Sequence, residues 1–337
     1  MPPATVQRIR EVTPIKGADF IEAVHVMGWT SVVKKGEFQP GDLCIYVEID
    51  TLVPIVPELE FLRNSCYFKR KDDDTEWFRI RTMKLRGVLS QGLILPLPEG
   101  LDAVEGQDVT EFLGAEHYEK PLDPCLGGEA WGQRPSFVRK TDEDRVQSVE
   151  DKLEALQGLP YYISQKLDGS SVTYAWTEHK DRSFFVCSRN LELKDTPEST
   201  AWNVSRKYGL QFIHVLSDLK DVYIQGELVG PGIQKNRQQL LDHDVYVFNM
   251  FRRTADMGWQ PVDLEKMVAV VRGLGLKTVP ILETGDSFNY TLEELLSKAQ
   301  GFYPGTKNRQ EGIVVRSQDQ SISFKVLNND YLLKDED

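Results

Sequence analysis

The distribution of apolar residues changes near residue 136, and this change limits the folds open to the chain more than any other feature. Before it, short runs rich in β-branched and aromatic residues follow one another closely, as in ADFIEAVHVMGWTSVVKK, DLCIYVEIDTLVP and WFRIRTMKLRGVLSQGLILPLP. Gly28, Gly36, Pro40 and Gly41 interrupt these runs, which is typical of strands joined by tight turns. Residues 1–115 are therefore predicted to form a small domain of short β-strands.

The closely spaced strands and glycine-marked corners of this domain favour a small barrel, and an OB-type β-barrel suits its length. Residues 116–135 then contain three prolines and three glycines and show no apolar period. They are predicted to form a linker.

From residue 136 to residue 337, strands and helices are mixed. Helices are predicted at 148–156, 199–216 and 263–276, and the segment TLEELLSKA begins with a capping box at Thr291. Strands are predicted for YYISQ, FFVCS, VYIQGELV and DVYVFNMF, and the segments EGIVVRS and SISFKVL form a hairpin near the end. This mixture indicates an α+β or α/β catalytic domain.

The formal net charge of -12 argues against a nucleic-acid partner, but the charge is unevenly placed. Residues 61–90 carry eight basic residues against four acids, a local excess of four positive charges. The basic residues are Arg63, Lys69, Arg70, Lys71, Arg79, Arg81, Lys84 and Arg86. Aromatic residues lie among them, and this mixture serves in other proteins to hold phosphates and stack bases. A solvated β-hairpin with two half-buried aromatic residues is an equal alternative.

No apolar run approaches the roughly 20 residues that a membrane span needs, and the start of the chain has no apolar signal segment. The four cysteines are scattered, without a CxxC pair or a histidine at metal spacing. A disulfide framework or a zinc site is therefore not expected. The five histidines are dispersed and are interpreted as structural or surface residues. We expect a soluble, intracellular protein, with the cytoplasm as its compartment.

The string Lys166-Leu167-Asp168-Gly169 follows the apolar strand YYISQ and begins a turn. By itself it indicates a turn with a solvated lysine, because such a string arises by chance in roughly one chain in ten of this length. A lysine at a strand exit nevertheless has its ammonium group aimed by a rigid element. A lysine acts as a nucleophile only when neutral, so its pKa must fall from about 10.4, and neighbouring cations or a bound metal supply that fall.

Three further charged residues lie on or beside apolar strands. Glu227 in VYIQGELVG and Glu311 in EGIVVRS each adjoin a glycine, which permits close approach of a ligand. Taken singly, each glutamate is better explained as an exposed residue at a strand end. Lys325 in SISFKVLNN is either an outward-facing edge charge or an inward-facing phosphate ligand.

Taken together, these residues resemble the nucleotidyltransferase motifs of polynucleotide ligases and mRNA capping enzymes. Six motifs follow the order of that superfamily between residues 137 and 328: Lys166–Gly169, Ser188-Arg189-Asn190, Glu227, the strand VYVFN with Phe248, Glu311-Gly312, and Lys325. The segment FVRKTDEDRVQ (137–147) looks like the one that RNA ligases place before the nucleophile. In that resemblance Arg145 occupies the position that contacts nucleotide or 5′-phosphate.

The order of the domains narrows the resemblance. DNA ligases and capping enzymes carry an OB domain after the last motif, whereas 12 residues follow Lys325 here and the β-rich domain comes first. This order is similar to that of the ATP-dependent RNA ligases with an N-terminal OB domain (RNA ligase family five). The resemblance implies an α+β fold in which residues 136–337 form a nucleotidyltransferase (ATP-grasp-like ligase) domain built on antiparallel sheets with helices.

The last motif departs from the pattern of many ligases, which have Lys–x–Lys there. This chain has Lys325-Val326-Leu327-Asn328. A second phosphate-binding lysine therefore has no clear position, and Lys334 is only a loose substitute.

The activity implied by the resemblance is ATP-dependent RNA ligation in three steps. Lys166 attacks the α-phosphorus of ATP to form a lysyl–AMP adduct, AMP passes to an RNA 5′-phosphate, and a 3′-hydroxyl displaces it. The implied cofactors are ATP and Mg²⁺ or Mn²⁺. Asp168, Glu227 and Glu311 are the carboxylates for the metal, and binding of the adenosine ribose is the alternative role for Glu227.

Roles for the other residues are implied in the same way. The catalytic residues are Lys166, Lys325 and Glu311. The nucleotide-binding residues are Arg145, Gln165, Asp168, Gly169, Arg189, Asn190, Glu227, Phe248 and Lys325, with Phe248 stacking on adenine. The residues expected to grip RNA in the first domain are Arg79, Arg81, Lys84 and Arg86. The expected partner is nicked or broken RNA with 3′-OH and 5′-phosphate ends, in RNA repair, and the expected state is a monomer away from membranes.

Two other functions stay open. A DNA ligase or a capping guanylyltransferase shares the covalent chemistry, although the domain order and the segment FVRKTDEDRVQ disfavour both. The second is a non-catalytic nucleic-acid-binding protein with an OB domain and a degenerate transferase domain. It is disfavoured because the lysine and both glutamates are present.

Overall fold

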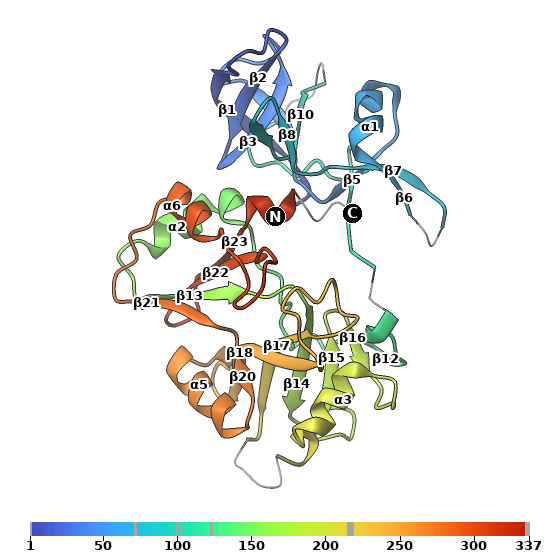
Figure 1. Cartoon of the computed structure of the whole chain (residues 1–337), viewed down its shortest axis with the longest axis vertical. Coiled ribbons are helices and arrows are strands. Elements are labelled where there is room, and N and C mark those ends of the chain that lie inside the picture. Colours follow the sequence, from blue (N-terminus) through green and yellow to red (C-terminus); the bar gives the residue numbers. More distant parts are fainter. Residues whose placement is uncertain are drawn as a thin grey trace. The chain divides into compact units, whose positions relative to one another are not determined.

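The computed structural model describes residues 2–70, 73–98, 100, 103–121, 124–213 and 219–333. The chain divides into two compact units, Met1–Pro121 with Leu332–Asp337, and Leu122–Tyr331 (Figure 1). Antiparallel sheets with a few short helices make up both units, which confirms the α+β class. Within the described ranges, no helix is both long and apolar enough to cross a membrane.

The first unit is built on a five-stranded antiparallel sheet in the order β10-β4-β1-β2-β3. Its strands are β1 (Ala4–Pro14), β2 (Ile21–Val26), β3 (Trp29–Lys34), β4 (Leu43–Val47) and β10 (Leu93–Pro96). The first half of β1 pairs with β4 and the second half pairs with β2, and the register shifts between Ile9 and Glu11. Such a bulge bends a long strand and lets it serve two partners, so the sheet can curl around an apolar core. That core includes Val6, Val24 and Tyr46, all fully buried.

Shorter elements complete the first unit. They are β5 (Thr51–Pro54), η1 (Pro57–Leu62), α1 (Arg63–Cys66), β6 (Tyr67–Lys69), β7 (Glu76–Arg79), β8 (Met83–Leu85), β9 (Val88–Ser90) and β11 (Glu116–His117). A second antiparallel sheet runs β11-β5-β7-β6, and β8 and β9 form a separate hairpin. The segment predicted as a linker therefore begins with two residues that pair with β5.

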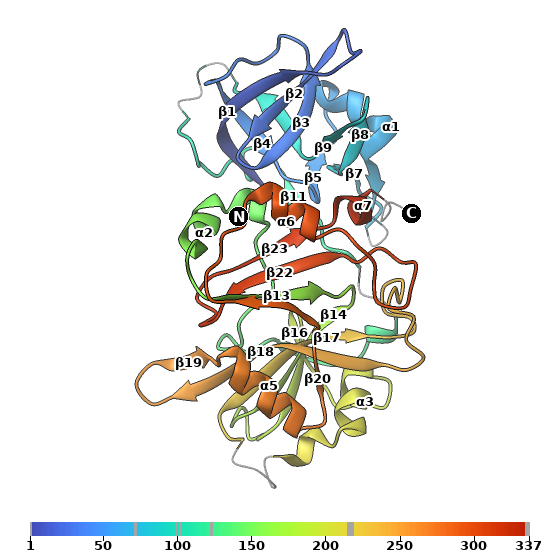
Figure 2. The same cartoon turned by 60° about the vertical axis from the view of Figure 1, so that its left-hand side comes forward.

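The second unit contains two sheets. The larger runs β12-β16-β15-β14-β17-β18-β19, and β20 pairs with β18 in parallel. Its strands are β12 (Ala130–Gln133), β14 (Ser170–Trp176), β15 (Phe185–Ser188), β16 (Leu191–Leu193), β17 (Val222–Val229), β18 (Asp244–Thr254), β19 (Gly258–Pro261) and β20 (Lys277–Thr278). Helices α3 (Thr200–Lys207) and α5 (Leu264–Gly273) pack on the face of this sheet that carries Val172, Tyr174 and Ile224, as Figure 2 shows.

The smaller sheet runs β21-β13-β22-β23. Its strands are β13 (Tyr161–Lys166), β21 (Ile281–Gly285), β22 (Gly312–Ser317) and β23 (Ser323–Leu327). The remaining helices are η2 (Pro124–Leu126), η3 (Val146–Ser148), α2 (Glu150–Leu156), η4 (Leu210–Phe212), α6 (Leu292–Lys298) and α7 (Asn329–Leu332). Ile163, Ile313 and Phe324 pack with α2 and α6 on one face of this sheet. The predicted capping box at Thr291 and Glu294 is present at the start of α6.

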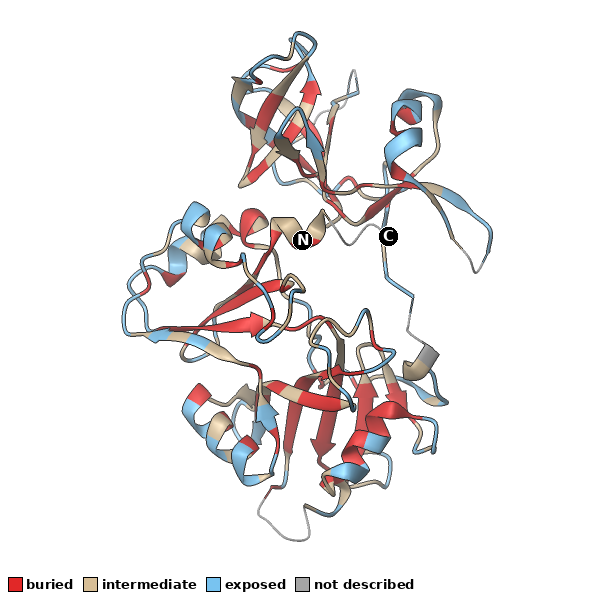
Figure 3. Ribbon diagram, in the orientation of Figure 1, coloured by how far each residue is buried: buried red, intermediate tan, exposed pale blue. Residues whose placement is uncertain are grey.

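Alternation along β13 sends Tyr162, Ser164 and Lys166 to the face opposite α2 and α6. Figure 3 shows β13 and the central strands of the larger sheet as almost wholly buried. Between β13 and β14 the chain leaves the smaller sheet and enters the larger one within three residues, Leu167, Asp168 and Gly169. Lys166 therefore lies where the two sheets of this unit are joined.

Candidate active site

Lys166 is the last residue of β13 and pairs with Gly312 on β22. Its Nζ lies 2.7 Å from Oε1 of Glu311, and the two side chains are 24% and 17% exposed. Residues 166 and 311 are far apart in the sequence but adjacent across the sheet, because β13 and β22 are neighbours. The strand pairing therefore brings the nucleophile motif and the fifth motif together.

The pKa of Lys166 is raised rather than lowered in this structure. Burial acts to lower it, but the negative charges of Glu311, Glu227 and Asp168 outweigh burial. From the sequence, neighbouring cations or a bound metal are expected to lower this pKa. The structure differs because three carboxylates surround the ammonium group and stabilise the charged, non-nucleophilic form of Lys166.

Glu227 lies on β17 opposite Ser171 and is half-buried. Burial raises the pKa of Glu227 to about 8, and the charges of Glu311 and Asp168 act in the same direction, while Lys166 opposes them. Gly169 makes this packing possible. A Cβ on Gly169 would lie 2.5 Å from the carbonyl oxygen of Leu228 and 2.8 Å from Cγ of Glu227.

Asp168 is buried and pairs with a residue that the sequence analysis did not identify. Nε of Arg237 donates to Oδ2 of Asp168 at 2.9 Å, and the two side chains are 12% and 7% exposed. The backbone N–H of Asp168 donates to the hydroxyl of Tyr303 at 2.9 Å. Arg237 and Tyr303 lie on loops far from the Lys166 motif in sequence, and no local pattern marks either of them.

Lys325 is on β23, next to the segment that precedes α2. Arg145 forms a parallel β-bridge with it, and the Lys325 N–H donates to the Asp144 carbonyl at 2.8 Å. Burial lowers the pKa of Lys325 to about 8, with further lowering by the cations of Arg145 and Lys166. The structure thus places Lys325 close enough to both Arg145 and Lys166 to be repelled by their charges. Such a cluster of cations suits bound phosphates.

The segment 141–144 ties several elements of the site together. Thr141 donates to Ser171 on β14 at 2.9 Å, and Asp142 pairs with Arg189 at 2.7 Å. Glu143 accepts hydrogen bonds from Arg316 on β22 at 2.8 Å and from Ser323 on β23 at 2.7 Å. Asp144 pairs with Lys152 on α2 at 2.7 Å. Arg145 is the residue of this segment predicted from the sequence to contact nucleotide or 5′-phosphate, whereas the structure shows that the residues before it join the two sheets.

Arg189 and Asn190 form the turn between β15 and β16 and are half-buried. The carbonyl of Asn190 accepts the backbone N–H of Arg134 at 2.9 Å. Phe248 is the extra residue at a bulge in β18, where the pairing moves from Asn249 to Val247 against two consecutive residues of β17. It packs against the cluster that contains Leu167 and Tyr303. Bulges beside active sites commonly re-aim a side chain.

Gln165 is not directed like Lys166. It is 4% exposed and lies on the α2 and α6 face of the smaller sheet. Its side-chain Nε2 donates to Oε1 of Gln310 at 2.7 Å, and its backbone N–H donates to the Pro280 carbonyl at 2.9 Å. The side chain of Gln165 therefore has a structural partner on the opposite face from the lysine.

The carboxylates of Asp168, Glu227 and Glu311 are hard oxygen ligands of the kind that Mg²⁺ and Mn²⁺ prefer. Burial is the main cause of the raised pKa of Glu227, and the charges of Glu311 and Asp168 raise it further. A divalent cation relieves repulsion of this kind between carboxylates. Among the described residues, however, no three acidic, histidine or cysteine side chains are close enough together to hold a metal ion. Asp168 is occupied by Arg237, and Glu311 by Lys166.

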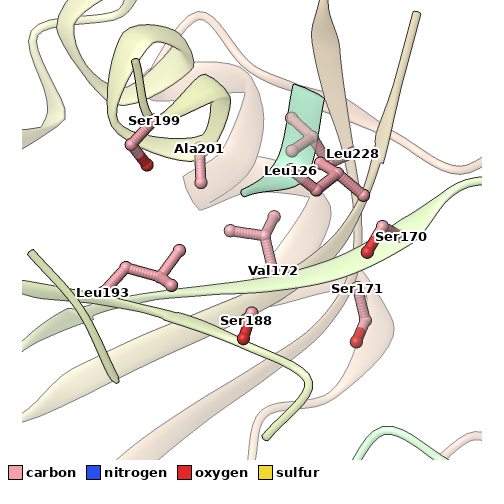
Figure 4. A pocket seen from close by; sticks show the side chains of 9 residues that line it. All are labelled: Leu126, Ser170, Ser171, Val172, Ser188, Leu193, Ser199, Ala201 and Leu228. Carbon is pink, nitrogen blue, oxygen red and sulfur yellow. The ribbon is translucent and has the colours of Figure 1, made fainter. Parts of the chain in front are cut away.

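Directly after the Lys166–Gly169 turn lies a cavity of about 20 Å³ between β14 and α3 (Figure 4). Ser170, Val172, Ser188, Leu193 and Leu228 contribute to its lining. This volume suits about one water molecule. It is far too small for a nucleotide, so this cavity is not the nucleotide-binding site.

The four residues predicted to grip RNA lie in the first unit and differ in their surroundings. Arg79 is held by Asp50 at 2.6 Å, and its guanidinium carbon lies 3.9 Å from the centre of the Tyr118 ring. Arg81 is half-buried, and Lys84 and Arg86 are exposed on the β8–β9 hairpin. Lys71 of the same basic stretch, and Lys334, lie outside the described residues.

Two sequence families match this chain. Residues 3–97 match a family described as an OB-fold domain, and residues 159–330 match one described as RNA ligase. The first match confirms the OB-type barrel expected for the N-terminal region. No curated protein matches the chain.

Solved structures of an RNA ligase from Naegleria gruberi are similar to the whole chain. A lysine-to-alanine mutant with ATP and Mn is 36% identical with a TM-score of 0.89, and the match covers 99% of this chain and 100% of that one. A structure with PPi is 36% identical with a TM-score of 0.88 and covers 98% of both chains. A glutamate-to-alanine mutant with AMP and Mn is 35% identical with a TM-score of 0.89 and covers 100% of both.

Proposed function

Because this chain belongs to the RNA ligase family, we propose that it seals 3′-OH and 5′-phosphate RNA ends through an AMP adduct on Lys166. It is an ATP-dependent RNA ligase. The observation that carries the proposal is the position of Lys166, aimed from the end of a buried strand into a group of carboxylates and cations. A surface lysine in a solvated turn has no such surroundings.

The first step makes and breaks one bond at phosphorus. Neutral Nζ of Lys166 bonds to the α-phosphorus of ATP while the bond to the bridging oxygen breaks, so pyrophosphate leaves and one amine proton passes to solvent. An oxygen of the RNA 5′-phosphate then bonds to the α-phosphorus of the adduct while its bond to Nζ breaks, and the amine takes back a proton. Finally the RNA 3′-hydroxyl oxygen bonds to the phosphorus of that 5′-phosphate and loses its proton, and AMP leaves. In such substitutions the protein contributes mainly positioning and neutralisation of charge.

Lys166 must lose a proton before it attacks. Its pKa is raised by the surrounding carboxylates, so deprotonation requires that other cations engage those carboxylates. The pKa of Lys166 is therefore expected to fall when ATP and a metal ion are bound, because their charges change the balance around the amine.

ATP and a divalent metal ion are the cofactors, in keeping with the Naegleria ligase structures that contain ATP or AMP with Mn. We assign Asp168, Glu227 and Glu311 to the metal. Mg²⁺ is usually held by one or two carboxylates and completes its shell with water and phosphate oxygens, so the three carboxylates need not meet at one point. When bound, the metal supplies positive charge that stabilises the charge developing on the phosphates.

The remaining residues divide between phosphate and nucleoside. Lys325 and Arg145, adjacent across a β-bridge, neutralise phosphate charge. Arg189 and Asn190 contact ribose or phosphate, and Phe248 stacks on adenine. Gln165 supports the nucleotide site indirectly, by holding β13 in place, because its side chain is bonded to Gln310 and its backbone N–H to the Pro280 carbonyl.

RNA is the partner of this enzyme. We propose that the preferred substrate is a nick in a duplex, that the enzyme acts as a monomer, and that residues 1–115 form the RNA-binding domain while residues 136–337 catalyse the reaction. The basic residues of the β8–β9 hairpin are the RNA contacts that we propose within the first of these domains.

The covalent step is tested with ATP labelled at the α-phosphate. We expect label to stay on the denatured wild-type protein and to be lost in Lys166→Ala and in Lys166→Arg. The arginine variant is the control for the ion pair with Glu311, since it keeps the charge but not the nucleophile. Both variants should still seal a nick whose 5′ end already carries AMP, because that step uses the RNA 3′-hydroxyl as nucleophile. Label retained in both variants would overturn the assignment of Lys166.

A further inference from the structure

The hydroxyl of Tyr303 contacts the backbone of three residues of the candidate active site, Lys166, Asp168 and Glu311. Tyr303 is on the loop between α6 and β22 and is 2% exposed. Its ring packs in the cluster that contains Leu167, Val229 and Val279. The aromatic body is thus part of the protein interior, and only the oxygen atom reaches the catalytic segment.

Three hydrogen bonds meet at this oxygen. The hydroxyl donates to the backbone carbonyl of Lys166 at 3.0 Å. It accepts the backbone N–H of Asp168 at 2.9 Å and the backbone N–H of Glu311 at 3.2 Å. A single atom therefore joins the main chain of the nucleophile to the main chain of two carboxylate residues of the site.

This arrangement exceeds what a buried tyrosine needs. One hydrogen bond satisfies a buried hydroxyl, as Tyr174 shows: it is fully buried and donates to the carbonyl of Ala201 at 3.0 Å. Tyr303 uses its donor and both acceptor positions, and every partner belongs to the backbone of a residue assigned to catalysis or metal binding. If Tyr303 only filled the core, its hydroxyl would not need hydrogen bonds to these three backbones.

The loop that carries Tyr303 is itself braced. The Tyr303 N–H donates to the Asn308 carbonyl at 3.0 Å, and Oγ1 of Thr306 donates to the Tyr303 carbonyl at 3.0 Å. Nδ2 of Asn308 donates to the carbonyl of Arg237 at 2.8 Å, and Arg237 is the residue that pairs with Asp168. The hydroxyl is therefore a fixed point rather than the tip of a loose loop.

We propose that Tyr303 is a positioning residue for lysine adenylylation. Its hydroxyl fixes the spacing between the backbones of Lys166, Asp168 and Glu311, so that the amine and the carboxylates keep one relative geometry while charges around them change. The proposal rests on the proposed function of Lys166. Because the hydroxyl contacts backbone and not ligand, it affects the rate of the reaction of bound ATP more than the binding of ATP.

The test is Tyr303→Phe, which keeps the buried ring and removes only the oxygen. Single-turnover uptake of label from α-labelled ATP is measured over a range of ATP concentrations. We expect the maximal rate to fall by about 10- to 100-fold, since small misplacements of reacting groups cost up to about 100-fold. We expect the ATP concentration at half-maximal rate to change by less than about threefold, since binding contacts are untouched.

Tyr174→Phe is the matched control, because it also removes one buried tyrosine hydroxyl from the same unit. It removes one hydrogen bond where Tyr303→Phe removes three, so it should lower the thermal midpoint by a smaller amount. It should leave the labelling rate unchanged. Thr306→Val supplies a second variant that loosens the loop but keeps the Tyr303 hydroxyl. It should slow labelling in the same direction by a smaller factor, which keeps the proposal testable if Tyr303→Phe does not fold.

The outcomes separate the two proposals. If the wild-type protein takes up no label, the assignment of Lys166 fails. If the wild type is labelled and Tyr303→Phe is labelled at the same maximal rate, the role of Tyr303 alone is overturned. Equal slowing in Tyr303→Phe and Tyr174→Phe would also overturn it, because the loss would then reflect stability and not position.

Discussion

Two glycines close to Lys166, the proposed nucleophile, have no room for a side chain. Gly169 packs against the carbonyl of Leu228 and the side chain of Glu227, and a Cβ on Gly312 would lie 2.2 Å from the carbonyl oxygen of Val326. Gly312 also has a φ of 150°, in the region that side chains disfavour. At both positions the absence of a side chain lets two strands that carry catalytic residues approach closely.

Gly169→Ala should both destabilise the protein and stop lysine labelling. The added methyl meets backbone rather than a flexible side chain, so the strands must separate, at a cost of about 1–3 kcal/mol, and Glu227 moves away from Lys166. Gly273→Ala is the control, because no atom lies within 4 Å of the added Cβ at the end of α5. It should be neutral or stabilising by up to about 1 kcal/mol. Urea unfolding and label uptake measure both effects, and normal labelling in Gly169→Ala would contradict the close-packing argument.

Candidate site residues could be predicted from the sequence where a local motif surrounds them. They could not be predicted where their interaction partners come from distant parts of the chain. Glu227 and Glu311 each adjoin a glycine on or near an apolar strand, and Lys166 ends such a strand three residues before Gly169. These local patterns made the three residues candidates. Tyr303 and Arg237 carry no such pattern, because their partners lie 135 and 69 residues away along the chain. The raised pKa of Lys166 was equally out of reach, since it depends on charges that strand pairing brings together.

At the scale of elements, strand β18 carries both contacts that stabilise the fold and Phe248, which we propose to stack on adenine. The strand begins at Asp244, and its bulge carries Phe248. Oδ1 of Asp244 accepts from the hydroxyl of Tyr208 at 2.7 Å, and Oδ2 accepts from Nζ of Lys277 at 2.7 Å. These contacts tie the start of β18 to the end of α3 and to β20.

Asp244 should make a pH-dependent contribution to stability. Burial acts to raise the pKa of Asp244, but the hydrogen bonds from Lys277 and Tyr208 outweigh it, so the pKa lies below its usual 3.8. The ionised form is favoured in the folded state, and its contribution is therefore full above about pH 4 and is lost as the pH falls below that value. Asp244→Asn should cost about 1–3 kcal/mol at pH 7.

Urea unfolding of Asp244→Asn and wild type at pH 7, 5 and 3.5 checks this sign. The difference in unfolding free energy should be equal at pH 7 and 5 and smaller at pH 3.5. A difference that narrows between pH 7 and 5 would show that another group is responsible.

Element types followed from the sequence more closely than element ends and partners. The helix predicted for 199–216 ends as α3 at Lys207, because Gly209 adopts a left-handed φ of 62° and a 3₁₀ turn follows. Residues 214–216 of that prediction lie outside the described residues. Within the predicted linker, Ala130–Gln133 forms β12 and pairs with β16, which its glycines and prolines concealed. Pairing with a distant strand, not local composition, decides the structure there.

At the scale of the whole molecule, an acidic chain acts on a polyanion. The formal charge is -12, yet the cations that matter are concentrated. Lys325, Arg145 and Lys166 gather in the second unit, and the basic stretch lies in the first. Net charge therefore describes solubility and long-range repulsion, while local placement decides where phosphate binds.

The basic residues of the first unit should contribute to RNA binding without contributing to the covalent step. Arg81, Lys84 and Arg86 are the candidates. Arg79 is already paired with Asp50 and stacked on Tyr118, so Arg79→Ala should chiefly reduce stability. In the triple alanine variant of the other three, we expect the RNA concentration at half-maximal sealing to rise about tenfold or more at 50–100 mM salt, since each lost phosphate contact weakens binding.

The control is a variant that loses three positive charges from another part of the same unit. Lys16, Lys34 and Lys35 are exposed in the same unit but outside the basic stretch, so their triple alanine variant changes the net charge equally. Nick sealing is measured against RNA concentration at several salt concentrations, with label uptake on Lys166 measured in parallel. Only the Arg81, Lys84 and Arg86 variant should lose affinity for RNA. A plot of the logarithm of its RNA affinity against the logarithm of the salt concentration should also be shallower, by roughly one unit of slope for each phosphate contact removed. The wild type and both variants should be labelled on Lys166 at the same rate. Equal losses in the two triple variants would mean that RNA responds to the overall charge of the chain, and Arg81, Lys84 and Arg86 would then have no specific part in binding.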